Sequence, residues 1–406
     1  MLSWKAKIII ILTSQLMSIV SSSVVGFSII LWISMETMSP LNLALCAIAT
    51  MLPNILLSPF IGVLTDSYSR KKIIILSDVL VAICTLLLSN IIKNGEYTFL
   101  LIYIFLSIRS IVGSFQMPAL QSSIPLIVPE EQISRVAGGY QAIISIGSII
   151  GPALGAICIS HMELYRIMYI DIIGAIIAVC IISTVTIPNP FDKKRTNIFS
   201  ISYIIKEVKY SIKKLTENKR IFSAFSYSIY VTFLLLPIAT LMPLFVIDKF
   251  SGNQFHISAI EIIWSIGALL GGILMSINKY KINHYKCISV MYFIIGLNFI
   301  LFGALKSNQF SLFTFLALIS GLCIAIYGSS YNSLLQISLD SKILGRIYSL
   351  IYSLNILPSF ISIIFISIFS EFLNMSIMFV TSGVLVLLIS IISFSKNLML
   401  ENKIKL

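Results

Sequence analysis

The sequence predicts an all-α membrane protein with twelve transmembrane helices, arranged as two six-helix bundles. Composition is the first indication, because 58% of the 406 residues are hydrophobic and 11% are charged, which is unlike a soluble domain. The second is a series of apolar runs of about 20 residues, each long enough to cross a hydrocarbon core of about 30 Å. The third is the placement of the basic residues between these runs.

Each predicted span is an apolar run bounded by charged or turn-forming residues. The first run is too long for the apolar region of a signal peptide, and no small-residue cleavage site follows it, so we expect no cleaved leader. In chain order, the predicted spans lie at about 8–33, 40–64, 73–92, 97–118, 137–159, 167–187, 221–246, 257–277, 287–305, 310–331, 347–369 and 375–394.

The basic residues orient the chain. Of the 28 Lys and Arg residues, 23 fall on the termini and on the alternate loops that share their side of the membrane, and Arg109 lies inside a span. This asymmetry predicts that both termini lie in the cytoplasm. The net charge of +12 is therefore a topology signal, with the lipid bilayer and not nucleic acid as the expected partner.

One long polar stretch, 188–220, divides the spans six and six. It predicts an N-terminal bundle at 1–187, a cytoplasmic linker and a C-terminal bundle at 221–406. Residues 198–217 place apolar side chains at helical spacing with lysines opposite. That pattern predicts an amphipathic helix on the cytoplasmic membrane surface.

A faint internal repeat links the halves. IPLIVPEEQISRV (124–136) aligns with LQISLDSKILGRI (335–347) at an offset of 211, so that Arg135 falls on Arg346. The offset is close to half the chain length. Two parallel six-span repeats are a plan used by secondary transporters.

The loop GVLTDSYSRKK, between the second and third spans, carries the most informative motif. Gly62 permits close packing where the second span ends. The Asp66 carboxylate is suited to accept charge-assisted hydrogen bonds from Arg70 or from backbone N–H groups at a helix start. A plain positively charged cytoplasmic loop is the alternative interpretation.

This loop resembles the signature loop between helices 2 and 3 of the major facilitator superfamily, with Ser67 and Ser69 in place of a basic residue and a glycine. The resemblance implies a latch that holds the two halves together on the cytoplasmic side, with its partner near Gly345 and Arg346. Asp78 is a further candidate partner for Arg70 or Lys71. The corresponding loop at 271–281 contains no acid, so the latch is expected to be one-sided.

Arg109 is a second candidate functional residue. An arginine inside a span costs at least about 2.5–3.5 kcal/mol on insertion scales, so it must face a cavity or a partner. The Arg-x-x-x-Gly pattern that ends at Gly113 resembles a fourth-span motif associated with proton coupling in exporters. A structural arginine bound to carbonyl groups is the alternative.

GSIIGPALGA, in the fifth span, is similar to the antiporter signature of the same superfamily. Gly147, Gly151 and Gly155 recur every four residues and form one smooth helix face for close packing. Pro152 removes a backbone hydrogen bond and permits a kink. Helix packing alone would also account for the glycines.

Four segments resemble the macrolide-efflux branch of the superfamily: SPFIGVLTDSYSRKK, MPALQSSIPLIVPEEQISRVAG, FHISAIEI and LGRIYSL. The resemblance implies a monomeric, proton-coupled exporter of amphipathic, cationic, macrolide-like small molecules that works by alternating access. Asp171 and Glu261, each near the outer end of a span, are the candidates to carry a proton or to pair with a cationic drug. Solvated acids at the membrane rim are the alternative.

Two other functions stay open on the sequence alone. The same motifs would serve an exporter of an endogenous metabolite, such as a siderophore or a peptide. A multispan membrane enzyme, such as an acyltransferase, is the more distant alternative, and the placement of His161, His256 and His284 in loops weighs against it. The sequence carries no P-loop or metal-binding spacing, so we expect neither a cofactor nor a metal site.

Overall fold

The computed structural model of the chain contains α-helices and short 3-10 turns, and no strand, over the residues that it describes. This confirms the predicted fold class. Because a bilayer offers backbone groups no water to bind, a helix is the form in which such apolar segments satisfy their own hydrogen bonds. The described residues are 3–37, 40–188, 201–252, 254–277, 282–351, 354–355 and 374–405.

The chain separates into two compact units. They differ from the two halves of the sequence, because each unit includes a short segment from the other half. Residues 339–353 belong to unit 1 and residues 131–145 belong to unit 2, and each of them overlaps one of the two segments that the internal repeat relates. Unit 1 comprises 1–130, 146–212 and 339–353, and unit 2 comprises 131–145, 213–338 and 354–406.

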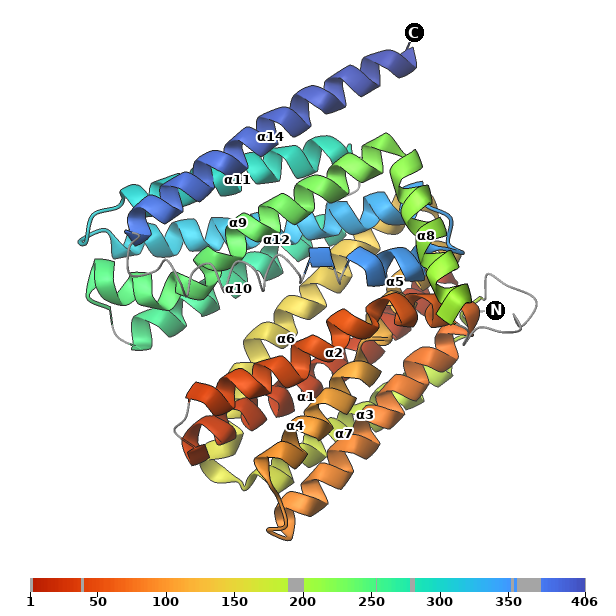
Figure 1. Ribbon diagram of the computed structural model, residues 1–406, viewed down its shortest axis with the longest axis vertical. Helices are drawn as coiled ribbons and strands as arrows, with labels where there is room; N and C mark the ends of the chain where they lie inside the picture. The colour runs from red at the N-terminus through yellow and green to blue at the C-terminus, as the bar shows by residue number, and fades with distance from the viewer. Residues whose placement is uncertain are drawn as a thin grey trace. The chain divides into compact units, whose positions relative to one another are not determined.

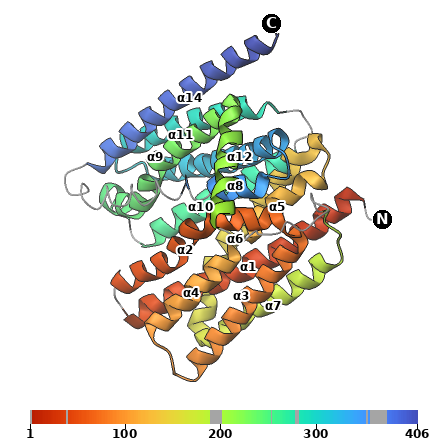
Figure 2. The same cartoon turned by 45° about the vertical axis from the view of Figure 1, so that its right-hand side comes forward.

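In unit 1, α7 packs against α1 and α3, and α4 packs against α2 and α3, so these helices lie side by side (Figure 2). Their apolar core includes Val25 and Ile29 of α1, Leu88 of α3 and Ile167 of α7. The helices are α1 (Trp4–Thr37), α2 (Pro40–Ser67), α3 (Arg70–Lys93), α4 (Phe99–Gly113), α5 (Gln116–Ser123), the later part of α6 (Ile133–His161), α7 (Leu164–Ser183) and the first part of α8 (Ile201–Glu217).

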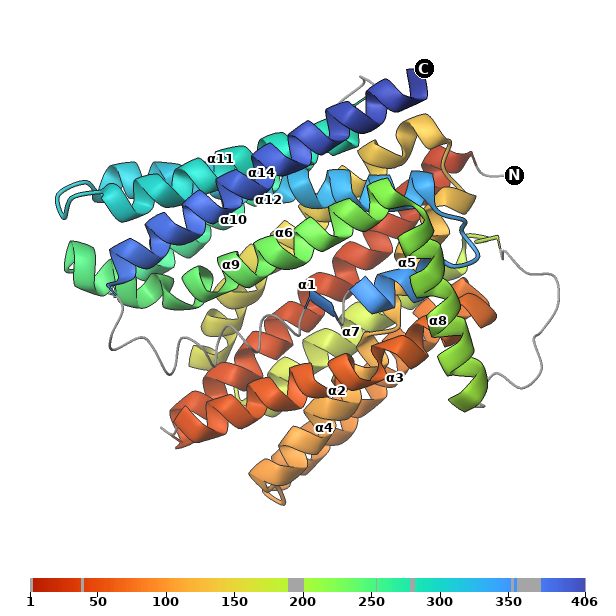
Figure 3. The same cartoon turned by 45° about the horizontal axis from the view of Figure 1, so that its top comes forward.

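In unit 2, α11 packs against α12 and α14, and α10 packs against α12 (Figure 3). A cluster of phenylalanines fills the space between these helices, with Phe245 and Phe379 at a ring separation of 4.3 Å. The helices are α9 (Lys219–Phe250), α10 (Gln254–Ile277), α11 (His284–Ala304), α12 (Phe310–Ser338), α14 (Met375–Lys405) and the first part of α6.

Nine helices in the described part of the chain are long and apolar enough to cross a membrane, and a bent pair within α2 makes up to ten. The chain is therefore a multi-pass membrane protein, and the count of twelve spans stays a prediction. Most of the predicted span 347–369 lies outside the described residues.

The predicted span 97–118 is broken into α4 and α5 at Ser114 and Phe115. Pro118 lies in the first turn of α5 and has no N–H to donate to the carbonyl group four residues earlier. The predicted amphipathic helix at 198–217 is present as α8 over Ile201–Glu217, and residues 198–200 lie outside the described part. Figure 1 shows α8 lying across the end of α2.

Candidate functional site

Asp66 lies in the last turn of α2 and faces the start of a helix that runs from residue 344 to 351. Its Oδ1 accepts a hydrogen bond from the backbone N–H of Gly345 at 3.0 Å. Its Oδ2 accepts one from the backbone N–H of Arg346 and one from Arg346 Nε, each at 3.1 Å. A carboxylate at a helix N-terminus meets free N–H groups and a favourable dipole, so this arrangement stabilises the docked helix.

Arg70 stands on the other side of the same carboxylate. Its guanidinium group lies 3.4 Å from Asp66 Oδ1 and donates to the backbone carbonyl groups of Ser122 and Ser341. The Arg70 side chain is fully buried. It therefore joins α2 and α3 to the end of α5 and to the segment that precedes the docked helix.

Two glycines make this approach possible. A Cβ atom at position 62 would lie 2.6 Å from the Cα of Arg346, and one at position 345 would lie 2.5 Å from Asp66 Oδ1. A side chain at position 62 would push the docked helix away from α2, and one at position 345 would displace the Asp66 carboxylate from its bonds. The expectation that Gly62 permits close packing agrees with this geometry.

Glu207 of α8 is a member of the site that the sequence analysis missed. Its carboxylate forms an ion pair with Arg346 Nη1. The available signal was an acid on the inner face of a lysine-rich amphipathic helix, beside Val208, which packs against Val63 of α2. We refer to Asp66, Arg70, Glu207 and Arg346 together as the Asp66 cluster.

Asp78 does not join the Asp66 cluster, so the expectation that it pairs with Arg70 or Lys71 is corrected. Its Oδ1 accepts hydrogen bonds from Ser18 Oγ and Gln116 Nε2, each at 2.8 Å. The physical reason is distance along α3, because eight residues separate Asp78 from Arg70, about 12 Å along a helix.

Arg109 and Asp171 were separate candidates in the sequence, and the structure brings them together. Arg109 Nη2 of α4 lies 2.8 Å from Asp171 Oδ2 of α7. Ser22 and Thr85 also donate hydrogen bonds to the Asp171 carboxylate, at 2.6 and 2.9 Å. Asp171 is buried, so it is not a solvated acid at the rim, and all four side chains belong to unit 1.

Glu261 lies in the second turn of α10 and is exposed. Within the described residues it makes no ion pair. It belongs to unit 2, whereas both charge clusters belong to unit 1, and it remains a candidate on the sequence pattern alone.

The glycines of α6 form a face against α1. Cβ atoms at Gly147, Gly151 and Gly155 would lie 2.6 Å from Ile19 Cγ2, 2.6 Å from Ser23 Cβ and 3.0 Å from Phe27 Cδ1, respectively. Both sets of residues recur every four positions, so the two helices match turn for turn. Pro152 lies inside this continuous helix.

Replacing Gly151 by alanine is expected to lower the free energy of unfolding by about 1–3 kcal/mol, because the new Cβ overlaps the Ser23 side chain and backbone. Gly26→Ala is the matched control, since a Cβ at Gly26 meets nothing within 4 Å. Thermal unfolding of the purified protein in detergent measures both. Equal midpoints for the two variants would contradict the close contact.

Unit 2 contains a counterpart of the Asp66 cluster without an acid. Arg135 Nε donates to the backbone carbonyl of Ser276 at 2.7 Å, at the end of α10. A Cβ at Gly138 would lie 2.5 Å from the Ser276 nitrogen. Arg135 thus binds a carbonyl where Arg346 binds a carboxylate. Residues 278–281 of the loop at 271–281 lie outside the described part of the chain, so the one-sided latch stays a prediction.

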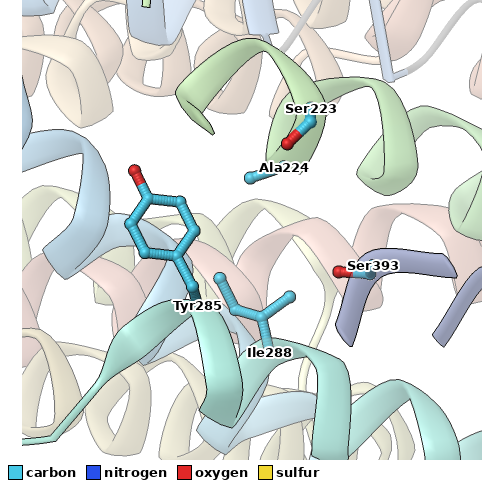
Figure 4. A pocket seen from close by; sticks show the side chains of 5 residues that line it. All are labelled: Ser223, Ala224, Tyr285, Ile288 and Ser393. Carbon is cyan, nitrogen blue, oxygen red and sulfur yellow. The ribbon is translucent and has the colours of Figure 1, made fainter. Parts of the chain in front are cut away.

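The structure contains a small cavity in unit 1 and a shallow pocket in unit 2. The cavity in unit 1, of about 220 Å³, is lined by Asn54, Ser58, Ser110 and Ser349, among others. It is smaller than the roughly 300–1,000 Å³ usual for drug-sized ligands, so we do not assign it as a drug site. Figure 4 shows a pocket of unit 2 in which Tyr285 and Ile288 face Ser223 and Ala224; it has no room for a water molecule.

No group of three or more His, Cys, Asp or Glu side chains that could hold a metal ion occurs in the part of the chain that the structure describes. In unit 1, the Asp66 cluster and the Arg109–Asp171 pair consist of acidic and basic side chains that bind one another. This chemistry suits a switch between two packed arrangements, in which ion pairs form and break without a covalent step.

Comparisons with known proteins cover nearly the whole chain. The sequence pattern of the Major Facilitator Superfamily matches residues 11–363. Macrolide efflux protein A of Streptococcus pyogenes is 32% identical over 390 residues, which cover 96% of each chain. Macrolide efflux protein A of Enterococcus faecalis is 33% identical over 74% of this chain and 92% of its own length.

Among solved structures, the human organic anion transporter MFSD10 superposes with a TM-score of 0.77 over 97% of this chain and 100% of its own. The two sequences are 13% identical. The likeness therefore concerns the fold alone.

Proposed function

Because the chain belongs to the Major Facilitator Superfamily, we propose that it exports amphipathic, macrolide-like small molecules, driven by protons, by alternating access. The observation that carries the substrate class is its likeness to Macrolide efflux protein A along almost the full length of both chains. We place it in the bacterial plasma membrane as a monomer. Both termini are assigned to the cytoplasm on the distribution of Lys and Arg.

In this proposal the Asp66 cluster is the lock on the cytoplasmic side. While Asp66 holds the backbone of Gly345 and Arg346, the helix that starts at residue 344 stays against α2. Opening to the cytoplasm requires these bonds to break together. Because Asp66 and both arginines are buried, separating them costs free energy. Binding of the drug or of a proton elsewhere has to offset this cost.

We assign the proton-coupling role to the Arg109–Asp171 pair. In a buried pair each charge is stabilised by the other, so a proton on Asp171 would release Arg109. Ser22 and Thr85 hold the carboxylate on α1 and α3, so a rearrangement of the Arg109–Asp171 pair would reach four helices. Glu261 is the second candidate, as a partner for a cationic drug.

We expect cells that express the chain to accumulate several-fold less labelled macrolide than cells without it. A protonophore is expected to abolish this difference, because export draws on the proton gradient. Accumulation over time in the two strains measures both effects. A difference that survives the protonophore would remove proton coupling from the proposal, and equal accumulation would remove the substrate class.

A panel of other amphipathic compounds, siderophores and peptides in the same two strains separates drug export from export of an endogenous metabolite. Preferential accumulation of a metabolite in the strain without the chain, with no change in macrolide, would replace the proposed substrate class and leave the transport mechanism untouched.

A further inference from the structure

The linker helix α8 contacts the machinery of unit 1 through one face. Val208 packs against Val63, near the end of α2, as do Phe60 and Leu64 of α2 itself. One position earlier, Glu207 forms an ion pair with Arg346. The first part of α8 therefore touches both sides of the contact that Asp66 makes: the end of α2 and the helix docked on it.

Charge balance gives this contact its importance. The Asp66 cluster contains two buried guanidinium groups, Arg70 and Arg346, whose side chains are 0% and 3% exposed. Asp66 supplies one buried negative charge. A second positive charge without a partner would be costly in this position, and Glu207 supplies the charge that balances it. Asp340, a nearby acid of the same segment, also attracts Arg70, but it is exposed, so water screens its charge.

The geometry of Arg346 shows how Glu207 acts. Arg346 Nε binds Asp66, Nη1 binds Glu207 and Nη2 donates to the carbonyl of Lys342 at 3.1 Å. All three guanidinium nitrogens are thus engaged. Because a guanidinium group is planar and rigid, holding Nη1 on Glu207 fixes the direction in which Nε points toward Asp66.

We infer that α8 is a working part of the lock and that Glu207 is the positioning residue for Arg346. The segment 339–351 leaves α2 only when Arg346 also leaves Glu207, so the position of α8 regulates opening. This inference rests on the proposed role of the Asp66 cluster, and it assigns to the linker helix a regulatory task that no sequence motif marks.

Docking of the segment is measured through Ser349, which is 1% exposed and lies beside Gly62. In the Ser349→Cys background, a small maleimide labels the new thiol when the segment leaves α2. The difference in labelling rate between membranes with and without Ser349→Cys removes the contribution of the six native cysteines. The full-length protein in membrane vesicles is used, with no substrate present.

Glu207→Gln is expected to raise this rate by about three- to tenfold at an unchanged amount of protein in the membrane, the range for one partly exposed charge-assisted bond. Glu207→Asp, which keeps the charge on a shorter side chain, is expected to fall between wild type and Glu207→Gln. It serves as the readout if Glu207→Gln fails to accumulate.

Glu217→Gln is the matched control on the same helix. Glu217 pairs with Lys214 at 2.8 Å in an exposed position, and this hydrogen bond lowers the pKa of the Glu217 carboxyl group. The control is expected to leave the labelling rate unchanged. Equal rates for Glu207→Gln and wild type, or equal increases in Glu207→Gln and Glu217→Gln, would overturn the inference.

The labelling assay needs no transported compound, so its result is independent of the substrate class. If wild type exports no macrolide but Glu207→Gln still speeds labelling, the role of α8 stands and the proposed substrate fails. If wild type exports macrolide and labelling does not respond to Glu207→Gln, the substrate stands and the role of α8 fails.

Discussion

Replacing Asp66 by asparagine is expected to reduce macrolide export at least about tenfold while the protein still inserts in the membrane. Asparagine keeps one acceptor oxygen, but it removes the negative charge between Arg70 and Arg346. Hydrogen bonds to a charged group contribute about 1.5–3 kcal/mol, so their weakening shifts the lock toward the undocked state by roughly tenfold or more. Accumulation of labelled drug, normalised to the amount of membrane protein, measures the effect.

Asp340→Asn is the control for this prediction. Asp340 lies on the docked segment, and its carboxylate is exposed and accepts a bond from the backbone N–H of Lys342. Loss of an exposed charge there is expected to leave export near the wild-type level. Wild-type drug accumulation in Asp66→Asn would show that the cluster is not the lock.

The second large effect is expected at the Arg109–Asp171 pair. Asp171→Asn leaves Arg109, whose side chain is 13% exposed, without its ionic partner, and removing one partner of a largely buried pair destabilises a fold by up to about 3–5 kcal/mol. Arg109→Gln leaves the negative charge of Asp171 without its partner, and we expect a similar loss of folding stability. The double variant removes both charges, and its loss in free energy of unfolding is expected to be smaller than the sum of the losses in the two single variants.

Thermal unfolding of wild type, the two single variants and the double variant in detergent gives the coupling energy of the Arg109–Asp171 pair. All three variants are expected to lose proton-driven export, because the coupling group is gone even when stability is regained in the double variant. Additive losses in stability would show that the pair does not interact, and retained export in the double variant would separate it from proton coupling.

The family and the helical fold could be predicted because they depend on short-range features of the sequence. Apolar runs of membrane length and the 62–72 loop predicted a transporter. The comparisons confirm that the chain belongs to the major facilitator family and that it is a transporter, not an enzyme. Cytoplasmic placement of the termini is a further prediction from the same sequence features.

Side-chain partners were harder to predict because they depend on which helix faces which. Arg109 and Asp171 were each marked by the cost of a charge in a span, yet only the fold, in which α4 and α7 both pack against α3, brings them together. Asp78 was paired with the wrong partners because its helix phase and its distance from Arg70 were not weighed. Glu207 was overlooked because an acid among the lysines of an amphipathic helix resembles an ordinary solvated helix face.

The most direct test of the account is uptake of labelled macrolide into proteoliposomes that contain only this protein, with and without an imposed proton gradient. We predict uptake that requires the gradient and that falls at least about tenfold with Asp66→Asn, through the loss of charge-assisted bonds at the lock. Uptake that ignores the gradient, or that Asp66→Asn leaves unchanged, would contradict proton-driven export through a lock centred on Asp66.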